Sequence, residues 1–143
     1  MAWRRYQMAG LLAALGILWM GCSKPESNHP KVYPVQGEVF FKGKPASNAV
    51  IQFHAANDSP KESLCPHAIV QPDGSFKLTT FATNDGAPAG TYAVTLTWPS
   101  PPKPGHDEEG PDRFQNRYAD LHKPLRQVQI QAGENKLDRI NLP

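Results

Sequence analysis

The sequence predicts an all-β fold, a seven-stranded antiparallel β-sandwich, and two observations lead to this prediction. From residue 35 onwards, short runs rich in Val, Ile, Phe, Tyr and Thr alternate with clusters of Gly, Pro, Asn and Asp, a pattern typical of strands separated by turns. No apolar pattern in this region keeps a helical period over the length that a helix needs. Seven short strands at this spacing favour two antiparallel sheets packed face to face.

The first two predicted strands cover residues 35–41 and 49–54. Residues 35–41 alternate apolar and polar side chains, and the second run places Ile51 and Phe53 on one face. Between the strands, residues 43–48 contain Gly, Pro and Asn, which are turn residues. We therefore expect the two strands to form a hairpin.

The third, fourth and fifth predicted strands follow a polar loop. Residues 67–70 and 75–80 are joined by Pro72-Asp73-Gly74, in which Gly74 can take the positive φ of a tight turn. Residues 91–98 alternate most regularly, with Tyr, Val, Leu and Trp on one face and Thr and Ala on the other. This last run is the clearest strand of the sequence.

The sixth and seventh predicted strands cover residues 125–131 and 136–142. Ile130 faces inward in the sixth, and Ile140 does so in the seventh. Leu137 is out of step with the seventh by one residue, and a β-bulge would account for it.

The N-terminus has the anatomy of a secretion signal over residues 1–21. Arg4 and Arg5 precede an uncharged, mostly apolar segment at residues 8–20. This segment is shorter than the roughly 20 apolar residues that cross a bilayer. A cleaved signal peptide is therefore expected rather than a permanent membrane span.

The junction Gly21-Cys22 resembles the lipobox of bacterial lipoproteins, with Trp19 in the position where that family usually has Leu. The resemblance implies cleavage before Cys22, diacylation of its thiol and a secreted protein that lipid holds to the membrane. Residues 22–34 are rich in Pro, Ser, Asn and charge and are expected to form a flexible tether. The alternative is an ordinary secretory signal peptide with an incidental cysteine.

Composition narrows the possible functions of the mature chain. Cleavage after residue 21 removes two of the 15 basic residues, so 13 basic residues face 13 acidic ones and the chain is close to neutral. No basic run alternates with aromatic residues, so we expect no binding of nucleic acid. The remaining 122 residues, 143 minus 21, suffice for one domain, placed at residues 35–143. With Cys22 acylated, Cys65 has no intramolecular partner.

Four short motifs occur in this domain in sequence order: Gly37-Glu38-Val39, Gly43-Lys44-Pro45, Asp73-Gly74-Ser75-Phe76 and Ala89-Gly90-Thr91-Tyr92-Ala93-Val94. These motifs resemble those of the carboxypeptidase regulatory-like, transthyretin-like β-sandwich, and the resemblance covers residues 35–142. It implies prealbumin-like or immunoglobulin-like Greek-key connectivity. The overall layout is similar to that of small lipoproteins of planctomycete bacteria.

The sequence lacks the common catalytic motifs. There is no Gly-x-Ser-x-Gly elbow, no His-Glu-x-x-His helix and no phosphate-binding glycine loop. The related hydroxyisourate hydrolases end in Tyr-Arg-Gly-Ser, whereas this chain ends in Arg-Ile-Asn-Leu-Pro. We therefore expect a non-catalytic protein without a cofactor, and a convergent triad of scattered Ser, His and Asp is the alternative.

Two surfaces are candidates for binding. Cys65 and His67 face the same side of an extended strand, and His54 would lie opposite His67 if the second and third strands pair. These three side chains would suit copper or zinc. The alternative is a buried cysteine with two solvent-facing histidines.

The second candidate lies in the long connection at residues 99–124. Asp112 could cap one or two helical turns that place Phe114 and Tyr118 on the edge of the domain. Arg113 and Arg117 would then project together as a cationic pair for an acidic ligand. The alternative is that both arginines are simply solvated.

Taken together, the sequence favours a lipid-anchored, non-catalytic module on the periplasmic or outer face of the cell envelope. Its expected partners are the membrane and an envelope protein or glycan. Metal handling by Cys65, His67 and His54 is the alternative function.

Overall fold

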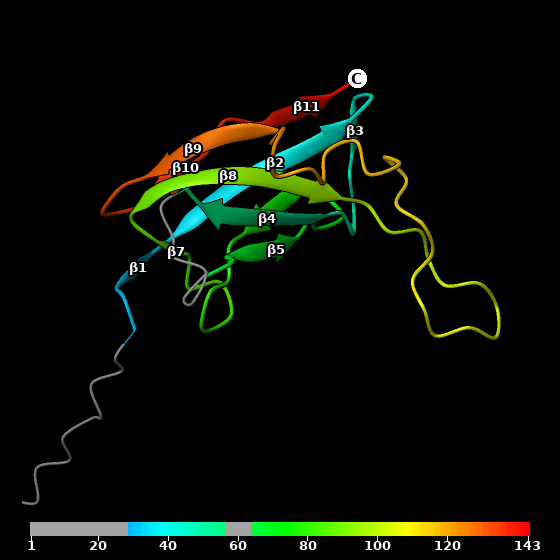
Figure 1. The fold of residues 1–143 in the computed structure, drawn as a ribbon, viewed down its shortest axis with the longest axis horizontal. Coiled ribbons are helices and arrows are strands. Elements are labelled where there is room, and N and C mark those ends of the chain that lie inside the picture. The colour runs from blue at the N-terminus through cyan, green and yellow to red at the C-terminus, as the bar shows by residue number, and fades with distance from the viewer. Residues whose placement is uncertain (1–28, 57–63) are drawn as a thin grey trace, which may run out of the picture.

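The computed structural model describes residues 29–56 and 64–143, which form strands and turns with no helix among them. The prediction of an all-β fold is therefore confirmed (Figure 1). The strands are β1 (Val32–Tyr33), β2 (Val35–Phe41), β3 (Lys44–Pro45), β4 (Val50–Ala55), β5 (His67–Ile69), β6 (Ser75–Lys77), β7 (Ala87–Pro88), β8 (Gly90–Thr97), β9 (Arg126–Ile130), β10 (Asn135–Lys136) and β11 (Ile140–Leu142).

One sheet has four antiparallel strands in the order β5-β4-β8-β9. Strands β4 and β8 form its centre and pair over six residues, from Val50 opposite Thr97 to Ala55 opposite Tyr92. The inward residues of β4 and β8 are fully buried, as the alternation in their sequences predicts.

The second sheet is built around β2 and is mixed. Strands β3 and β6 pair with β2 antiparallel, whereas β10 and β11 pair with it in parallel. The prediction of purely antiparallel sheets is therefore wrong. A parallel pair needs a long crossover connection, and the whole four-stranded sheet lies between β2 and β10 in the chain and provides it.

The predicted hairpin between residues 35–41 and 49–54 is also wrong, because β2 and β4 lie in different sheets. The turn residues between them form two turns rather than one. Lys42 and Gly43, with φ of 49° and 74°, close a short hairpin between β2 and β3. Asn48, with φ of 67°, then directs the chain into the other sheet.

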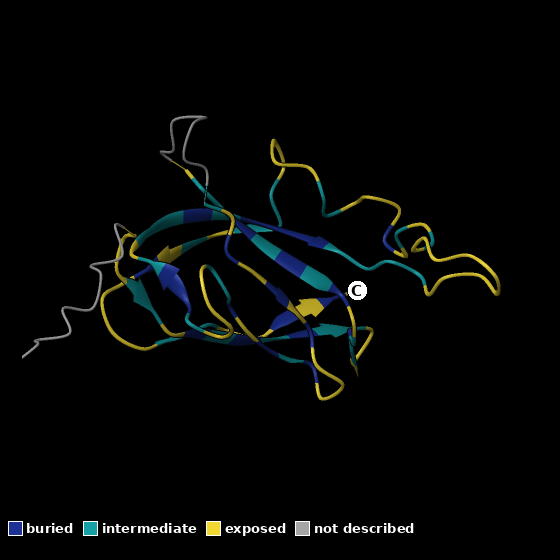
Figure 2. Ribbon diagram, turned by 90° about the horizontal axis from the view of Figure 1, so that it is seen from below, coloured by how far each residue is buried: buried dark blue, intermediate teal, exposed yellow. Residues whose placement is uncertain are grey.

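Both sheets contribute side chains to one hydrophobic core. Figure 2 shows buried residues along the strands of both layers. The buried apolar residues of the core are Val35, Val39, Ala46, Ala49, Ile51, Phe53, Ala68, Val70, Phe76, Leu78, Ala87, Tyr92, Val94, Leu96, Phe114, Ile130, Ile140 and Leu142. Each of the seven predicted runs contains a strand, and the four additional strands have two residues each.

The predicted bulge at Leu137 is present. Lys136 pairs with Gln36 and Ile140 pairs with Val39, so four steps on one strand match three steps on the other. The extra residue lies between β10 and β11 and lets Leu137 pack against the core while Ile140 returns to an inward position.

The long connection at residues 99–124 has a closed base. Pro99 and Asp112 form an antiparallel bridge, and the Ser100 amide donates to the carbonyl of Pro111 at 3.1 Å. Residues 101–109 are exposed and form a protrusion at one end of the molecule (Figure 1).

The opposite end contains β1, β7 and the loop at residues 79–86. The carboxylate of Asp85 organises this loop: Oδ1 accepts the Thr80 amide at 2.7 Å, and Oδ2 accepts the amides of Phe81 and Ala82 at 2.9 and 2.8 Å. Burial by itself raises the pKa of Asp85, but the hydrogen bonds from Thr80, Ala82 and Phe81 outweigh it and hold the pKa below its ordinary value.

Candidate functional site

Four aromatic rings form a cluster at the end of β8, where the second half of the long connection meets the β2–β3 hairpin. The rings of Phe41 and Trp98 pack edge to face with centroids 5.8 Å apart. Phe114 lies 5.4 Å from Phe41 and 5.3 Å from Trp98, and Tyr118 extends the cluster at 5.2 Å from Phe114. These spacings are those of favourable aromatic pairs. Phe114 is buried, whereas the other three rings are partly exposed.

The carboxylate of Asp112 fixes the position of this cluster. Its Oδ1 accepts the amides of Trp98 and Phe114 at 2.6 and 3.2 Å, and its Oδ2 accepts the amide of Asn116 at 2.8 Å. The indole Nε1 of Trp98 donates to the carbonyl of Ser47 at 2.8 Å. Asp112 therefore joins the end of β8 to the turns that follow it.

Residues 112–118 form consecutive turns and not the predicted helix. Amide–carbonyl bonds join Gln115 to Asp112 and Arg117 to Phe114, each spanning three residues. Gln115 and Asn116 have φ of 55° and 59°, which a right-handed helix does not allow. The capping role predicted for Asp112 is present, because its side chain accepts amides of the following turn.

Three cations lie over the rings of the cluster. The guanidinium carbon of Arg113 is 4.8 Å from the ring centroid of Trp98, and that of Arg117 is 5.9 Å from Tyr118. From the β2–β3 hairpin, Nζ of Lys42 is 5.2 Å from the ring of Phe41. These distances allow cation–π attraction.

The cations and rings border a shallow open cleft of about 530 Å³, which we call the cationic cleft. Its lining residues carry three cationic side chains and no anionic side chain. They are Phe41, Lys42, Arg113, Phe114, Gln115, Arg117, Tyr118 and Pro143.

The sequence predicted part of this site. Arg113 and Arg117 border the same cleft, as the predicted cationic pair requires, although each lies over a different ring. Lys42 was missed, because only the fold of the β2–β3 hairpin brings it near residues 113–117. No local signal in the sequence pointed to it.

A second cluster combines His54 on β4 with Cys65 just before β5. Nδ1 of His54 lies 3.8 Å from Sγ of Cys65, and its Nε2 lies 2.9 Å from Oγ1 of Thr95. Burial lowers the pKa of His54 and raises the pKa of Cys65. Both shifts favour the neutral forms, so the thiol and the imidazole meet as uncharged groups at neutral pH.

His67 does not join this pair. The predicted placement of His54 opposite His67 is wrong, because β5 pairs His67 with Gln52, two residues away along β4. Nδ1 of His67 lies 3.3 Å from the carbonyl of Cys65 instead. In the two described stretches of the chain, no three His, Cys, Asp or Glu side chains are grouped so that they could hold a metal ion.

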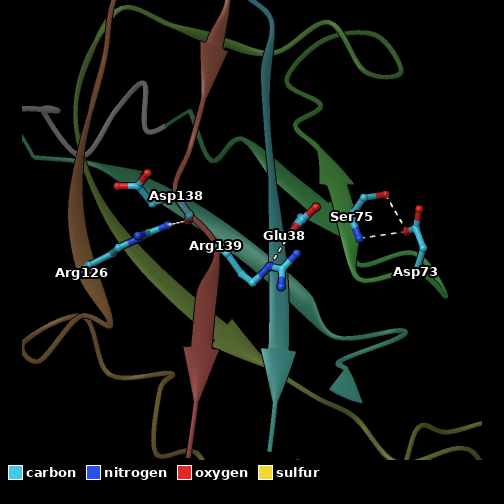
Figure 3. Close-up of polar contacts among 6 residues, drawn as sticks. All are labelled: Glu38, Asp73, Ser75, Arg126, Asp138 and Arg139. Atoms are coloured by element: carbon cyan, nitrogen blue, oxygen red, sulfur yellow. Dashed lines mark hydrogen bonds and ion pairs between the residues drawn. The ribbon is translucent and has the colours of Figure 1, made fainter. Parts of the chain in front are cut away.

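The outer face of the β2 sheet carries charges of both signs, and Arg139 and Glu38 form an ion pair there (Figure 3). Nε of Arg139 lies 2.5 Å from Oε2 of Glu38, and the guanidinium of Arg139 also covers the ring of Phe40 at 4.4 Å. Nη2 of Arg126 donates to the carbonyl of Asp138 at 2.6 Å. These contacts connect β2, β9 and the chain before β11 and have a structural role.

The predicted lipidation site, Cys22, lies outside the described residues. Within residues 29–56 and 64–143, no helix is long and apolar enough to cross a membrane.

No family model matches the chain, and no curated protein matches it in sequence. Among solved structures, a 9R-lipoxygenase from Cyanothece PCC8801 is similar to this chain with a TM-score of 0.42 and 10% sequence identity. The match covers 85% of this chain and 18% of the lipoxygenase, so the chain spans less than a fifth of that protein.

Proposed function

We propose that the protein is a lipid-anchored, non-catalytic binding module of the bacterial cell envelope, held by acyl chains on Cys22. The observation that carries this proposal is the order of features in the sequence: Arg4 and Arg5, an uncharged apolar run at residues 8–20, and then Gly21-Cys22 directly before a polar, Pro-containing stretch. Secretion followed by cleavage and acylation accounts for all of these features together.

The nature of the cationic cleft supports a role in binding. The cationic cleft offers positive charge, partly exposed aromatic rings and an amide, all of which are groups that hold a ligand. The Cys65–His54 pair places a thiol beside an imidazole. Its two pKa shifts favour the neutral thiol over the thiolate that would react.

The proposal includes a seven-stranded Greek-key sandwich of the carboxypeptidase regulatory-like, transthyretin-like kind. The structure gives a physical reason for glycine at two positions of these motifs, and both reasons are compatible with such a sandwich. A Cβ at Gly37 would lie 2.7 Å from the ring of Phe76 across the strand pair. Gly74 takes φ of 90° in the turn before β6, where its amide donates to the carbonyl of Gln71.

Metabolic labelling with palmitate in a bacterial host tests the anchor. We expect the wild-type protein to incorporate the label and to sediment with the membrane fraction. Cys22→Ser should abolish both properties, whereas Cys65→Ser, which removes the other cysteine, should leave both unchanged. Label that persists in Cys22→Ser would refute the proposal.

A second candidate function is copper or zinc handling, which one observation favours. Sγ of Cys65 and Nδ1 of His54 are 3.8 Å apart, close enough for both to bind one soft metal ion. Titration with Cu(I) under reducing conditions tests this candidate. Binding should be lost in Cys65→Ala and in His54→Ala but kept in His67→Ala, and binding that survives Cys65→Ala would rule it out.

A further inference from the structure

The cationic cleft differs from the cleft beside β2, β6 and β10 in the side chains that line it. Its own lining has cationic but no anionic side chains, whereas Glu38 and Asp138 lie among the cations of the other cleft. In the described part of the chain, the Arg139–Glu38 contact is the one ion pair. Lys42, Arg113 and Arg117 lie outside this pair and border one cleft together, whereas Glu38 partly offsets the charge of Arg139. Three like charges around one cleft repel one another, and an anion in the cleft would relieve that repulsion.

The arginines of the cleft are held in place before any ligand arrives. Arg113 and Arg117 each lie over an aromatic ring, and the ring beneath Arg113 belongs to Trp98, whose amide and indole are both hydrogen bonded. Such placement lowers the entropy that a guanidinium loses when it binds an anion. Guanidinium groups also match carboxylates with two parallel hydrogen bonds.

The aromatic surface restricts the chemistry of the ligand further. Phe41 and Tyr118 are partly exposed and line the cleft beside Lys42 and Arg117, which lie over their rings. A ligand that fills this space must present flat, C–H-rich faces to the rings as well as anionic groups to the cations. Pyranose rings that carry carboxylates have both properties.

The position of the cleft argues against the anchoring membrane as the source of the anion. The described chain begins next to β1, and Figure 1 places β1 at the left of the strands and β3 at their right, with the protrusion of residues 101–109 extending beyond β3. The cleft lies beside the β2–β3 hairpin. The cleft therefore lies away from the strand at which the described chain begins.

We infer that the cationic cleft binds an acidic oligosaccharide, a short chain of pyranose sugars with carboxylate groups. Arg113 and Arg117 bind the carboxylates, Lys42 adds charge from the facing hairpin, and the rings of Phe41 and Tyr118 contact the sugar faces. This inference specifies the ligand class for the binding role proposed above and rests on that role.

The test uses the full chain purified in non-ionic detergent and titrated with an oligomer of galacturonic acid. We expect saturable binding that weakens as salt rises, because salt screens exposed charges. Replacing both arginines, in Arg113→Gln/Arg117→Gln, should weaken binding at least tenfold. Lys77→Gln/Lys136→Gln, which removes two positive charges from the outer face of the β2 sheet, should leave the affinity unchanged.

Titrations with other ligands and other variants distinguish an acidic oligosaccharide from other anions, and distinguish a cleft that does not bind from an anchor that is absent. A neutral galactose oligomer, oligoglutamate and phosphatidylglycerol vesicles should each bind more weakly than the galacturonate oligomer. Tighter binding of the peptide or the vesicles, or equal binding by the double arginine variant, would overturn the inference. Cys22→Ser should bind the oligomer as well as the wild type does, so failure of the lipid anchor and failure of the cleft give different results. Arg113→Lys/Arg117→Lys, which keeps the charge, should recover part of the affinity.

Discussion

At each end of the molecule an aspartate carboxylate accepts hydrogen bonds from backbone amides, but the two ends present different groups to solvent. We call the end with β1, β7 and residues 79–86 the tether end, and the end with the cationic cleft the cleft end. At the tether end, Asp85 accepts three backbone amides of the loop at residues 79–86. At the cleft end, Asp112 also accepts three backbone amides, one of them from Trp98, which lies 14 residues earlier, directly after β8. Asp85 thus orders a local loop, whereas Asp112 ties two distant segments together.

The charges around the two aspartates also differ. The cleft end carries three cations without an ion pair, at Lys42, Arg113 and Arg117. At the tether end, Phe81 stacks on His29 with ring centroids 4.3 Å apart, and β1 pairs with β7. The comparison teaches that the hydrogen-bonding device by itself does not mark a site. At the tether end Lys31 also has no ion pair in the described chain, and its Nζ lies 5.4 Å from the ring centroid of Tyr33. We therefore propose a site from the grouping of three cations around one cleft and not from missing ion pairs.

The largest expected effect is at the tether end, in Gly86→Ala. Gly86 has φ of 99°, and a Cβ there would lie 1.7 Å from the carbonyl oxygen of Tyr33. Because backbone must move, we expect a loss of about 4 kcal/mol in the free energy of unfolding. Gly105→Ala is the control, since Gly105 also has a positive φ but open space around it. Equal losses in urea denaturation of the two variants would contradict the close packing of β1 against residue 86.

The next largest effect is at the cleft end, in Asp112→Ala. This variant leaves three backbone amides without their acceptor, so we expect a loss of about 3 kcal/mol in the free energy of unfolding. The fluorescence of Trp98 should change as well, because its amide is released. Asp107→Ala, in the exposed protrusion, removes the same charge and should change neither quantity. A stable Asp112→Ala protein would show that Asp112 does not join the two segments.

The next prediction compares how the free energy of unfolding depends on pH in the wild type and in Asp85→Asn, which keeps the shape of the side chain but removes its charge. The pKa of Asp85 is lower in the folded protein than in the unfolded chain, so its contribution is present above the unfolded pKa and is lost as pH falls through the folded pKa. Asp85→Asn should therefore be about 2 kcal/mol less stable than the wild type at pH 7. The gap should narrow as the pH is lowered below about 4. A gap that stays constant down to pH 2 would exclude a role for the carboxylate charge.

The smallest expected effects on the free energy of unfolding come from two surface changes, one at the arginines of the cleft and one at the Arg139–Glu38 ion pair. Arg113→Gln/Arg117→Gln removes two exposed cation–π contacts and should cost about 1 kcal/mol in the free energy of unfolding. Glu38→Gln breaks an exposed ion pair and should cost less than about 1 kcal/mol. Thermal denaturation of both variants provides the comparison. A loss above about 3 kcal/mol in the double variant would mean that the arginines serve the fold instead of a ligand.

The sequence predicted those parts of the fold that depend on local pattern. The alternation in residues 91–98, the positive φ of Gly74 and the bulge at Leu137 were all predicted, because period and turn chemistry are local properties. The partners of β2 were not, since sheet pairing depends on contacts between segments far apart in the chain. The turns at residues 43–48 did not reveal that the chain changes sheets there.

In the candidate site, too, the features set by neighbouring residues could be predicted and those set by contacts between distant segments could not. Asp112 as a cap and the shared cleft of Arg113 and Arg117 could be predicted from neighbouring residues. Lys42 and the pairing of His54 with Cys65 could not, because they depend on the register between segments distant in sequence. The helix predicted for residues 112–118 is replaced by turns with left-handed residues.

Mass spectrometry of the N-terminal peptide, taken from protein isolated out of its native membranes, tests the central proposal most directly. We expect a mature chain that begins at Cys22 and carries the mass of a diacylglyceryl group on that residue. An unmodified amino terminus at any other position would contradict it.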